Sequence, residues 1–160
     1  MDQPAYPDDD GAVDPAVQAA VDEYARGGQF GDVLVALGTA RIIVPVVAMP
    51  ARTAPDPRAG SAGQKEGEMA AVLTTGADGR TALLAFTGLP GLQRWDPHAR
   101  PVPVSTPDAA RAATDEGATA IVIDIAGPVR VVVETGDLEQ LAAGRLLFRT
   151  GSGYAWGVRP

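Results

Sequence analysis

The sequence lacks cysteine altogether, and its 160 residues include a single histidine, His98, and a single lysine, Lys65. Without a thiol the chain has no disulfide, no iron–sulfur ligand and no cysteine nucleophile. A catalytic zinc site without thiolates takes two or three histidines, and one imidazole is too few. We therefore expect no bound metal and no cofactor.

Long apolar runs are also missing, since none approaches the roughly 18 residues that a membrane-spanning helix needs. The first thirteen residues contain neither the basic nor the apolar region of a secretory signal. Acidic residues outnumber basic ones by 20 to 13, which gives a net charge of −7 and disfavours binding to nucleic acid or to an anionic membrane. We expect a cytoplasmic protein with neither kind of partner.

The composition is that of an ordinary globular domain, with 46% hydrophobic and 21% charged residues. The length predicts one domain, which we place at residues 14–160. Residues 1–13 contain two prolines and the run Asp8–Asp10, so we expect a flexible N-terminal tail there. Residues 50–67 contain three prolines and three glycines and predict a flexible loop.

Local patterns predict an α+β fold, a mixed β-sheet of about five to six strands with helices packed on it. Helices are predicted at 15–26, 30–37, 88–95, 107–116 and 137–143, and strands at 41–48, 68–75, 80–87, 101–104, 118–125 and 129–134, with a further strand or hairpin within 146–158. Two of the helices begin with a favoured N-cap residue followed by a proline in the first turn. The cap is Asp14 in the first of them and Ser105 or Thr106 in the second.

Two strands carry specific expectations. The run Ala118–Ile125 is almost continuously apolar, which indicates burial on both faces. We expect Ile121, Ile123, Val131, Leu84 and Phe86 to form the core of the sheet. Pro45 lacks an N–H donor, so the strand that contains it is predicted to lie at an edge or to carry a bulge.

Seven stretches, read in order, resemble the N-terminal domain of the SseB family of bacterial proteins. They are Leu37–Pro45, Asp78–Arg80, Leu84–Trp95, Pro101–Val104, Asp108–Gly117, Ala120–Pro128 and Leu138–Gly144. The order of these landmarks over residues 14–148 carries the resemblance, and the chain looks like an actinobacterial-type, single-domain member. The resemblance implies the fold, and it implies no established reaction, cofactor or catalytic residue.

The surface that most suggests binding is the segment that contains Arg94, Trp95, His98 and Arg100. Arginine offers fork-shaped donors, tryptophan an amphipathic face, and histidine a group that titrates near neutral pH. These residues predict a surface for a protein partner or an anion. The alternative is that Trp95 belongs to the core and that His98 lies in an ordinary loop.

Asp124 is the second candidate, because it follows the apolar run Ala120–Ile123 directly. A carboxylate at a strand end can act as a general base or a metal ligand. The alternative, which we favour, is that its side chain accepts hydrogen bonds from backbone N–H groups of the turn at Ile125–Pro128. No Rossmann or Walker glycine pattern opens a helix after a strand, which gives no support for a nucleotide site of those types.

The sequence is compatible with two functions. The first is a non-catalytic protein-binding or adaptor module, with an unknown protein partner or with self-association through a sheet edge. The second is a small-molecule-binding or hydrolytic enzyme whose site is assembled around Asp124 and Arg94 or His98. We assign no catalytic residue, and we expect the first function because the sequence has few nucleophiles, bases and metal ligands.

Overall fold

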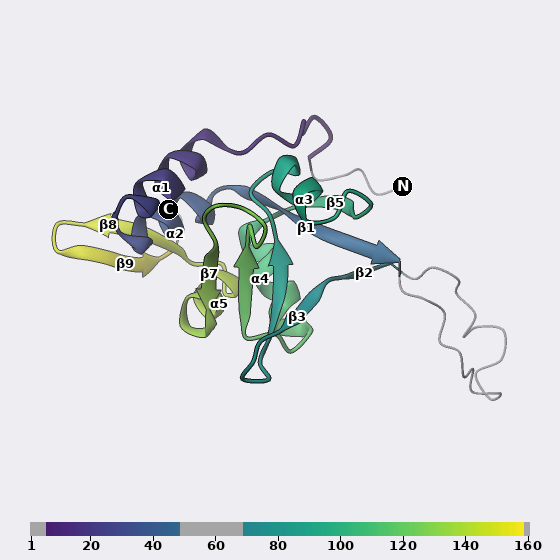
Figure 1. The fold of residues 1–160 in the computed structure, drawn as a ribbon. Coiled ribbons are helices and arrows are strands. Elements are labelled where there is room, and N and C mark those ends of the chain that lie inside the picture. The colour runs from purple at the N-terminus through teal and green to yellow at the C-terminus, as the bar shows by residue number, and fades with distance from the viewer. Residues whose placement is uncertain (1–5, 49–68, 159–160) are drawn as a thin grey trace.

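Five helices and nine strands make up the computed structural model, which describes residues 6–48 and 69–158 (Figure 1). The helices are α1 (Pro15–Ala25), α2 (Phe30–Gly38), α3 (Leu89–Trp95), α4 (Thr106–Asp115) and α5 (Thr135–Ala142). The strands are β1 (Arg41–Ala48), β2 (Met69–Ala71), β3 (Leu73–Thr75), β4 (Thr81–Ala85), β5 (Arg100–Ser105), β6 (Ala120–Ile123), β7 (Val131–Glu134), β8 (Leu146–Thr150) and β9 (Gly153–Gly157). The predicted α+β class is confirmed.

Side-chain caps start two of these helices where the sequence predicted them. The Asp14 carboxylate accepts a hydrogen bond from the backbone N–H of Ala16 at 2.8 Å, at the start of α1. The Ser105 hydroxyl accepts one from the N–H of Asp108 at 3.1 Å, at the start of α4. Each cap satisfies a donor that the first helical turn leaves without a partner.

The strands form sheets in the orders β2-β1-β5, β3-β4-β6-β7 and β8-β9. The four-stranded sheet is mixed, because β4 and β6 are parallel whereas its other pairs are antiparallel. The first two sheets meet where Ile43 and Phe86 exchange two backbone hydrogen bonds of 2.7 Å. Segment 69–75 pairs first with β1 and then with β4, so it also connects the two sheets.

Pro45 does not lie in an edge strand, and that prediction is wrong. Strand β1 lies between β2 and β5, and its register with β5 continues through Pro45 without a bulge. On the other side of β1, Ile43 bonds to Phe86 and Val46 pairs with Ala71. Residues two apart in a strand point their N–H groups to the same side. The N–H that Pro45 lacks would therefore point to the same side as that of Ile43, at the place where β1 stops pairing with the end of β4 and begins to pair with β2.

Two apolar clusters lie on opposite faces of the strands. The larger cluster takes residues from α1, α2, α4 and α5 and from one face of the sheets, including Ile121, Ile123 and Val131. The smaller cluster holds Phe86 with residues of α3 and of the following loop. Each residue predicted for the core is buried, with an exposed fraction of 2% or less, although Phe86 and Leu84 lie outside the larger cluster.

The prediction that the run Ala118–Ile125 is buried on both faces is wrong. Within β6 the side chains of Ile121 and Ile123 are buried, whereas Ala120 and Val122 are only half-buried. Strand β7 alternates in the same way, with Val132 half-buried on the same side as Val122. One face of the four-stranded sheet is therefore only partly covered by the described residues.

Residues 9–13 make specific contacts, although residues 1–13 were predicted as a flexible tail. The Arg41 guanidinium forms an ion pair with Asp9 and donates to the carbonyl of Ala12. The Leu89 N–H donates to the Gly11 carbonyl at 2.7 Å, and a Cβ at Gly11 would lie 2.7 Å from the Leu89 Cβ. Gly11 has φ of +81°, so glycine suits this position on both grounds. These contacts argue against a free tail over residues 9–13.

The C-terminal hairpin β8–β9 packs on α2. The Asp32 carboxylate of α2 accepts hydrogen bonds from the Tyr154 hydroxyl at 2.6 Å and from Arg149 at 2.8 Å. The Tyr154 ring also lies close against Gly31, where a Cβ would be only 2.5 Å from a ring carbon. A glycine at this position is thus required for the close approach of the hairpin.

The predicted loop at 50–67 lies outside the described residues. In the parts of the chain that the structure describes, no helix combines the length and the hydropathy needed to cross a membrane.

Candidate functional site

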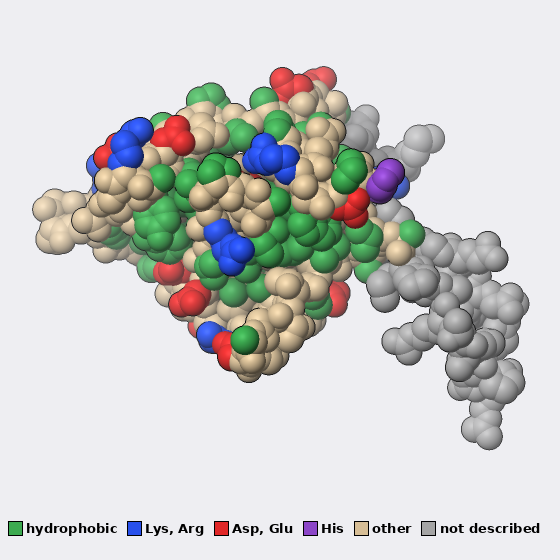
Figure 2. Space-filling model, viewed as in Figure 1, with side chains coloured by type: hydrophobic (Ala, Val, Ile, Leu, Met, Phe, Trp, Pro, Cys, Tyr) green, Lys and Arg blue, Asp and Glu red, His purple; other side chains and the backbone are tan. Residues whose placement is uncertain are grey.

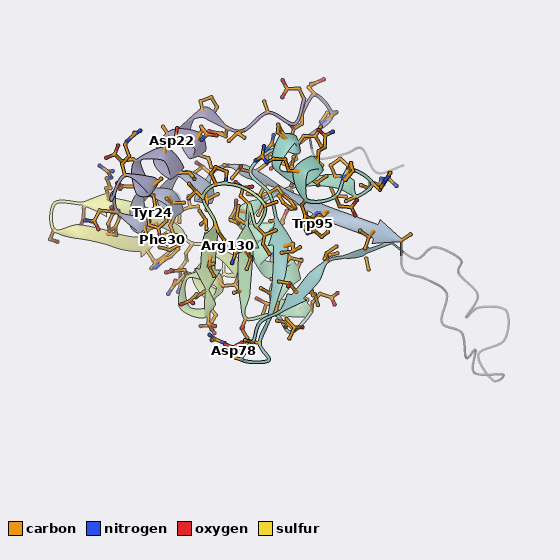
Figure 3. The ribbon with its side chains drawn as sticks, in the orientation of Figure 1. Asp22, Tyr24, Phe30, Asp78, Trp95 and Arg130 are labelled. Carbon is orange, nitrogen blue, oxygen red and sulfur yellow. The ribbon has the colours of Figure 1, made fainter. Side chains whose placement is uncertain are left out.

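A cleft of about 290 Å³ opens between α1, α3 and the turn that connects β6 to β7. Its walls are mostly apolar, and α1 contributes Val17 and Val21 while the turn contributes Pro128 and Val129. Its charged side chains are Asp22, Arg94 and Asp124. In the view of Figure 3, Asp22 marks the side of the cleft that α1 forms.

Asp124 connects the ends of two parallel strands. Its carboxylate accepts hydrogen bonds from the Thr87 N–H at 3.0 Å and from the Thr87 hydroxyl at 2.7 Å. Its own N–H donates to the Ala85 carbonyl at 3.0 Å. Asp124 has φ of +58°, a left-handed conformation that aspartate tolerates better than most residues. The side chain therefore does not cap its own turn, which corrects our prediction, and it binds the residues that follow β4 instead.

A second set of contacts holds Thr87 from the other side. The Arg41 guanidinium donates to the Thr87 carbonyl at 2.7 Å and pairs with Asp9. Both members of that ion pair are largely buried, with exposed side-chain fractions of 10% for Arg41 and 13% for Asp9. The hydrogen bonds from Arg41 are the main cause that lowers the pKa of Asp9. Thr87 and Asp124, which line the cleft, are thus connected by hydrogen bonds to the ion pair of Arg41 and Asp9 behind them.

Arg94 lies at the open side of the cleft, and its side chain is exposed. Two glycines from different elements border its guanidinium, because a Cβ built at Gly91 or at Gly127 would lie 3.7 Å from the Arg94 Nη2. The Gly91 position would also be 3.2 Å from the Asp124 Oδ1. Within residues 6–48 and 69–158, Arg94 makes no ion pair and no side-chain hydrogen bond.

The structure separates the four residues of the predicted binding surface. Trp95 is half-buried in the smaller apolar cluster, with its ring centroid 5.8 Å from that of Phe86. His98 is exposed in the loop after α3, and Arg100 is exposed at the start of β5. Neither His98 nor Arg100 lines the cleft. Arg94 and Asp124, which the enzyme alternative placed in one site, both line the cleft.

The sequence did not identify α1 as a wall of this cleft. The spacing of Val17 and Val21 predicts a buried helix face, and both side chains are buried in the structure. That spacing does not say which part of the chain the face contacts. Asp22 and Gln18, which follow these valines on the same helix, line the cleft and are joined by a hydrogen bond of 2.8 Å.

These features define an α+β domain in which a polar network that contains Thr87 and Asp124 adjoins a cleft bordered by Arg94. The family model for the SseB protein N-terminal domain matches residues 17–140, which is most of the chain. The protein belongs to the SseB family, as the order of its sequence landmarks predicted. Searches of the curated proteins and of the solved structures gave no match.

Proposed function

We propose that this SseB-family domain is a non-catalytic binding module and that Arg94 holds a carboxylate side chain of a protein partner. The observation that carries the proposal is the free guanidinium of Arg94 at the open side of an apolar cleft, as the described residues form it. Arginine binds a carboxylate through two parallel N–H donors, and such charge-assisted bonds are stronger than neutral ones. The valines and prolines of the cleft would contact the aliphatic part of the same partner segment.

The charges of the cleft favour a single carboxylate over a phosphate. Arg94 is the one cationic side chain among the described lining residues, and Asp22 and Asp124 are negative. A phosphate dianion or a nucleic acid would meet two carboxylates and one guanidinium, and the protein as a whole carries a charge of −7. One carboxylate matches one arginine with less repulsion.

The chemistry of the lining residues argues for binding over hydrolysis. Thr87 carries a hydroxyl, but it is buried and already donates to Asp124. His98, the imidazole of the hydrolytic alternative, does not line the cleft. Covalent catalysis needs a nucleophile that the substrate can reach, and the Thr87 hydroxyl is buried.

A selection from a random peptide library tests this proposal. The library would be selected on the wild-type protein, and each enriched peptide would then be measured on Arg94→Gln and on Arg145→Gln. Arg145 is an exposed arginine beyond α5, so it controls for a general loss of positive charge. We expect enriched peptides to contain Asp or Glu and to bind Arg94→Gln at least about tenfold more weakly, as the loss of a charged hydrogen-bonded pair implies.

The proposal is contradicted if no peptide is enriched, or if enriched peptides bind wild type and Arg94→Gln equally. Equal weakening by Arg145→Gln also contradicts it, because the effect would then come from net charge.

A small organic carboxylate is the second candidate for the same cleft. A volume of about 290 Å³ is close to the lower end of the range for small-molecule sites, roughly 300 Å³. Thermal-shift measurements with short aliphatic carboxylates, and with the corresponding amides, test this candidate. A shift that requires both the carboxylate and Arg94 supports it, and no shift with any of the acids removes it.

A further inference from the structure

We propose that the partly covered face of the four-stranded sheet packs against the same face of a second copy of this chain. This face is formed by β3, β4, β6 and β7, and we call it the open face; it includes Ala82, Ala120, Val122 and Val132. The inference goes beyond the proposed function, because it concerns a different surface and a different partner.

The sequences of β6, a central strand, and of β7, the edge strand beside it, would bury more apolar surface than one copy covers. Strands β6 and β7 read Ala-Ile-Val-Ile and Val-Val-Val-Glu, so apolar side chains point to both faces of the sheet. Strands with this pattern are usually covered on both sides. Here the helices cover one face, and the open face leaves Val122 and Val132 half-buried over a shallow groove of about 330 Å³.

Figure 2 shows the consequence at the surface. A band of apolar side chains crosses the middle of the open face, with one basic side chain within it. Figure 3, in the same orientation, labels that residue as Arg130 and places Asp78 at the turn between β3 and β4. Contiguous apolar patches of this kind on a folded protein mark interaction sites.

An edge-to-edge contact through β5 is disfavoured by its prolines. Pro101 and Pro103 lie opposite Pro45 and Ile43 of β1. Ile43 points its N–H away from β5 and toward Phe86. The pairs Ile43–Pro103 and Pro45–Pro101 are therefore of the kind whose members do not hydrogen-bond to each other. The ring nitrogens of Pro101 and Pro103 therefore face outward, and this edge lacks the donors that a further strand would need. The open face thus offers a better surface for self-association than the β5 edge does.

The charges on the open face of one copy are complementary to those on the open face of a second copy. Arg130 and Glu134 lie two residues before and two residues after Val132, and all three line the same groove. At about 3.4 Å per residue, Arg130 and Glu134 are roughly 13 Å apart along β7. In the described part of the chain neither side chain forms an ion pair. Asp78 and Arg80 also line the groove, but they pair with each other. Arg130 and Glu134 therefore leave each copy with one positive and one negative end, and Val132 lies between them.

This pattern selects one orientation of the two copies. In this orientation a two-fold axis lies between the two sheets, perpendicular to the strands and level with Val132. The two copies of β7 are then antiparallel, and Arg130 of each copy lies over Glu134 of the other. The parallel orientation would place Arg130 over Arg130. Two sheets stacked this way lie about 10 Å apart, as in a β-sandwich.

Charge reversal tests the proposal by sedimentation velocity. We expect wild-type protein to be a dimer and both Arg130→Glu and Glu134→Arg to be monomers, because each single reversal opposes like charges. The double variant with both changes should be a dimer again. An equimolar mixture of the two single variants should form a heterodimer, since the glutamate introduced at position 130 then faces the arginine introduced at position 134. Arg145→Glu, away from this face, should remain a dimer.

Circular dichroism would show that each variant is folded, which is expected because both side chains are exposed. A wild-type protein that stays monomeric over a hundredfold range of concentration overturns the proposal. So does a dimer that persists in both single variants, or a double variant that fails to recover the dimer while both singles are monomers.

Discussion

Asp124 and Thr87 are 37 residues apart in the chain, and the carboxylate of the first accepts hydrogen bonds from both the N–H and the hydroxyl of the second. This contact closes the ends of β4 and β6 and forms the back of the Arg94 cleft. We expect Asp124→Ala to lower the free energy of unfolding by about 2–3 kcal/mol, through two lost hydrogen bonds and a Cβ in a left-handed conformation that alanine tolerates poorly.

Asp124→Asn is the matched control for that change. Asparagine tolerates the left-handed conformation and still accepts a hydrogen bond from the Thr87 N–H, so we expect a loss of about 1 kcal/mol. Urea denaturation measures both variants. Equal stability of wild type and Asp124→Ala would show that the contact contributes nothing to folding.

The two faces of β6 should respond differently to truncation. Ile123 is fully buried among the helices, and Ile123→Ala should cost about 2–5 kcal/mol. Val122, its neighbour on the open face, is half-buried, and Val122→Ala should cost less than about 1 kcal/mol in the monomer. Chemical denaturation at low protein concentration compares the two. A reversed order would place the core on the other face of the sheet.

The ion pair of Arg41 with Asp9 should make stability depend on acid. Because Arg41 lowers the pKa of Asp9 in the folded protein, the stabilisation is complete above the ordinary aspartate pKa and is lost as the pH falls through the lower folded value. Arg41→Ala should cost about 3 kcal/mol at neutral pH, since it leaves a largely buried carboxylate without its partner.

Asp9→Asn supplies the comparison for that pH dependence. Below the ordinary aspartate pKa, the stability of this variant should decrease less with falling pH than that of the wild type. Thermal unfolding across an acid pH series measures the difference. If the wild type and Asp9→Asn lose stability equally with falling pH, other carboxylates cause the pH dependence.

Substitutions at the contact between the hairpin β8–β9 and α2 should change the pKa of Asp32 and the stability of the hairpin. The Tyr154 hydroxyl and then Arg149 lower the pKa of Asp32, and Asp32 raises the pKa of Tyr154. Tyr154→Phe should therefore raise the pKa of Asp32 toward its ordinary value, which an NMR titration of the carboxyl carbon detects.

Gly31→Ala should act on the same contact by sterics, because the new Cβ would overlap the Tyr154 ring. Faster amide hydrogen exchange in β8 and β9, with unchanged exchange in β6, is the expected result. Full protection of the hairpin in this variant would contradict the packing described for it.

Local signals in the sequence predicted most elements of this fold, although the single strand predicted at 68–75 is divided between β2 and β3. The Asp14 and Ser105 caps and the strand at 41–48 each depend on neighbours in the chain, and each was predicted. Pro45 shows where that information ends. Its missing donor indicates a break in the ladder, but only the arrangement of β4 and β2 on one side of β1 shows that the break lies in a central strand.

The site was harder to predict because its residues come from distant segments. Arg94 and Asp124 were both candidates, yet the cleft exists only because α1 packs across the turn after β6. The proximity of Arg94, Trp95, His98 and Arg100 in sequence suggested one surface. Trp95 instead turns into the apolar cluster, and β5 carries Arg100 away from the cleft. Contact between segments, rather than composition, decides which side chains meet.

A double-mutant cycle between Arg94 and the partner's carboxylate shows most directly whether the guanidinium binds that group. Isothermal titration would compare an enriched acidic peptide and its Asp→Asn or Glu→Gln counterpart on wild type and on Arg94→Gln. If the guanidinium binds that carboxylate, each change alone weakens binding at least about tenfold and the second change adds little to the first. If the two changes weaken binding independently, so that their free energies add, Arg94 does not hold the carboxylate and the proposed function is wrong.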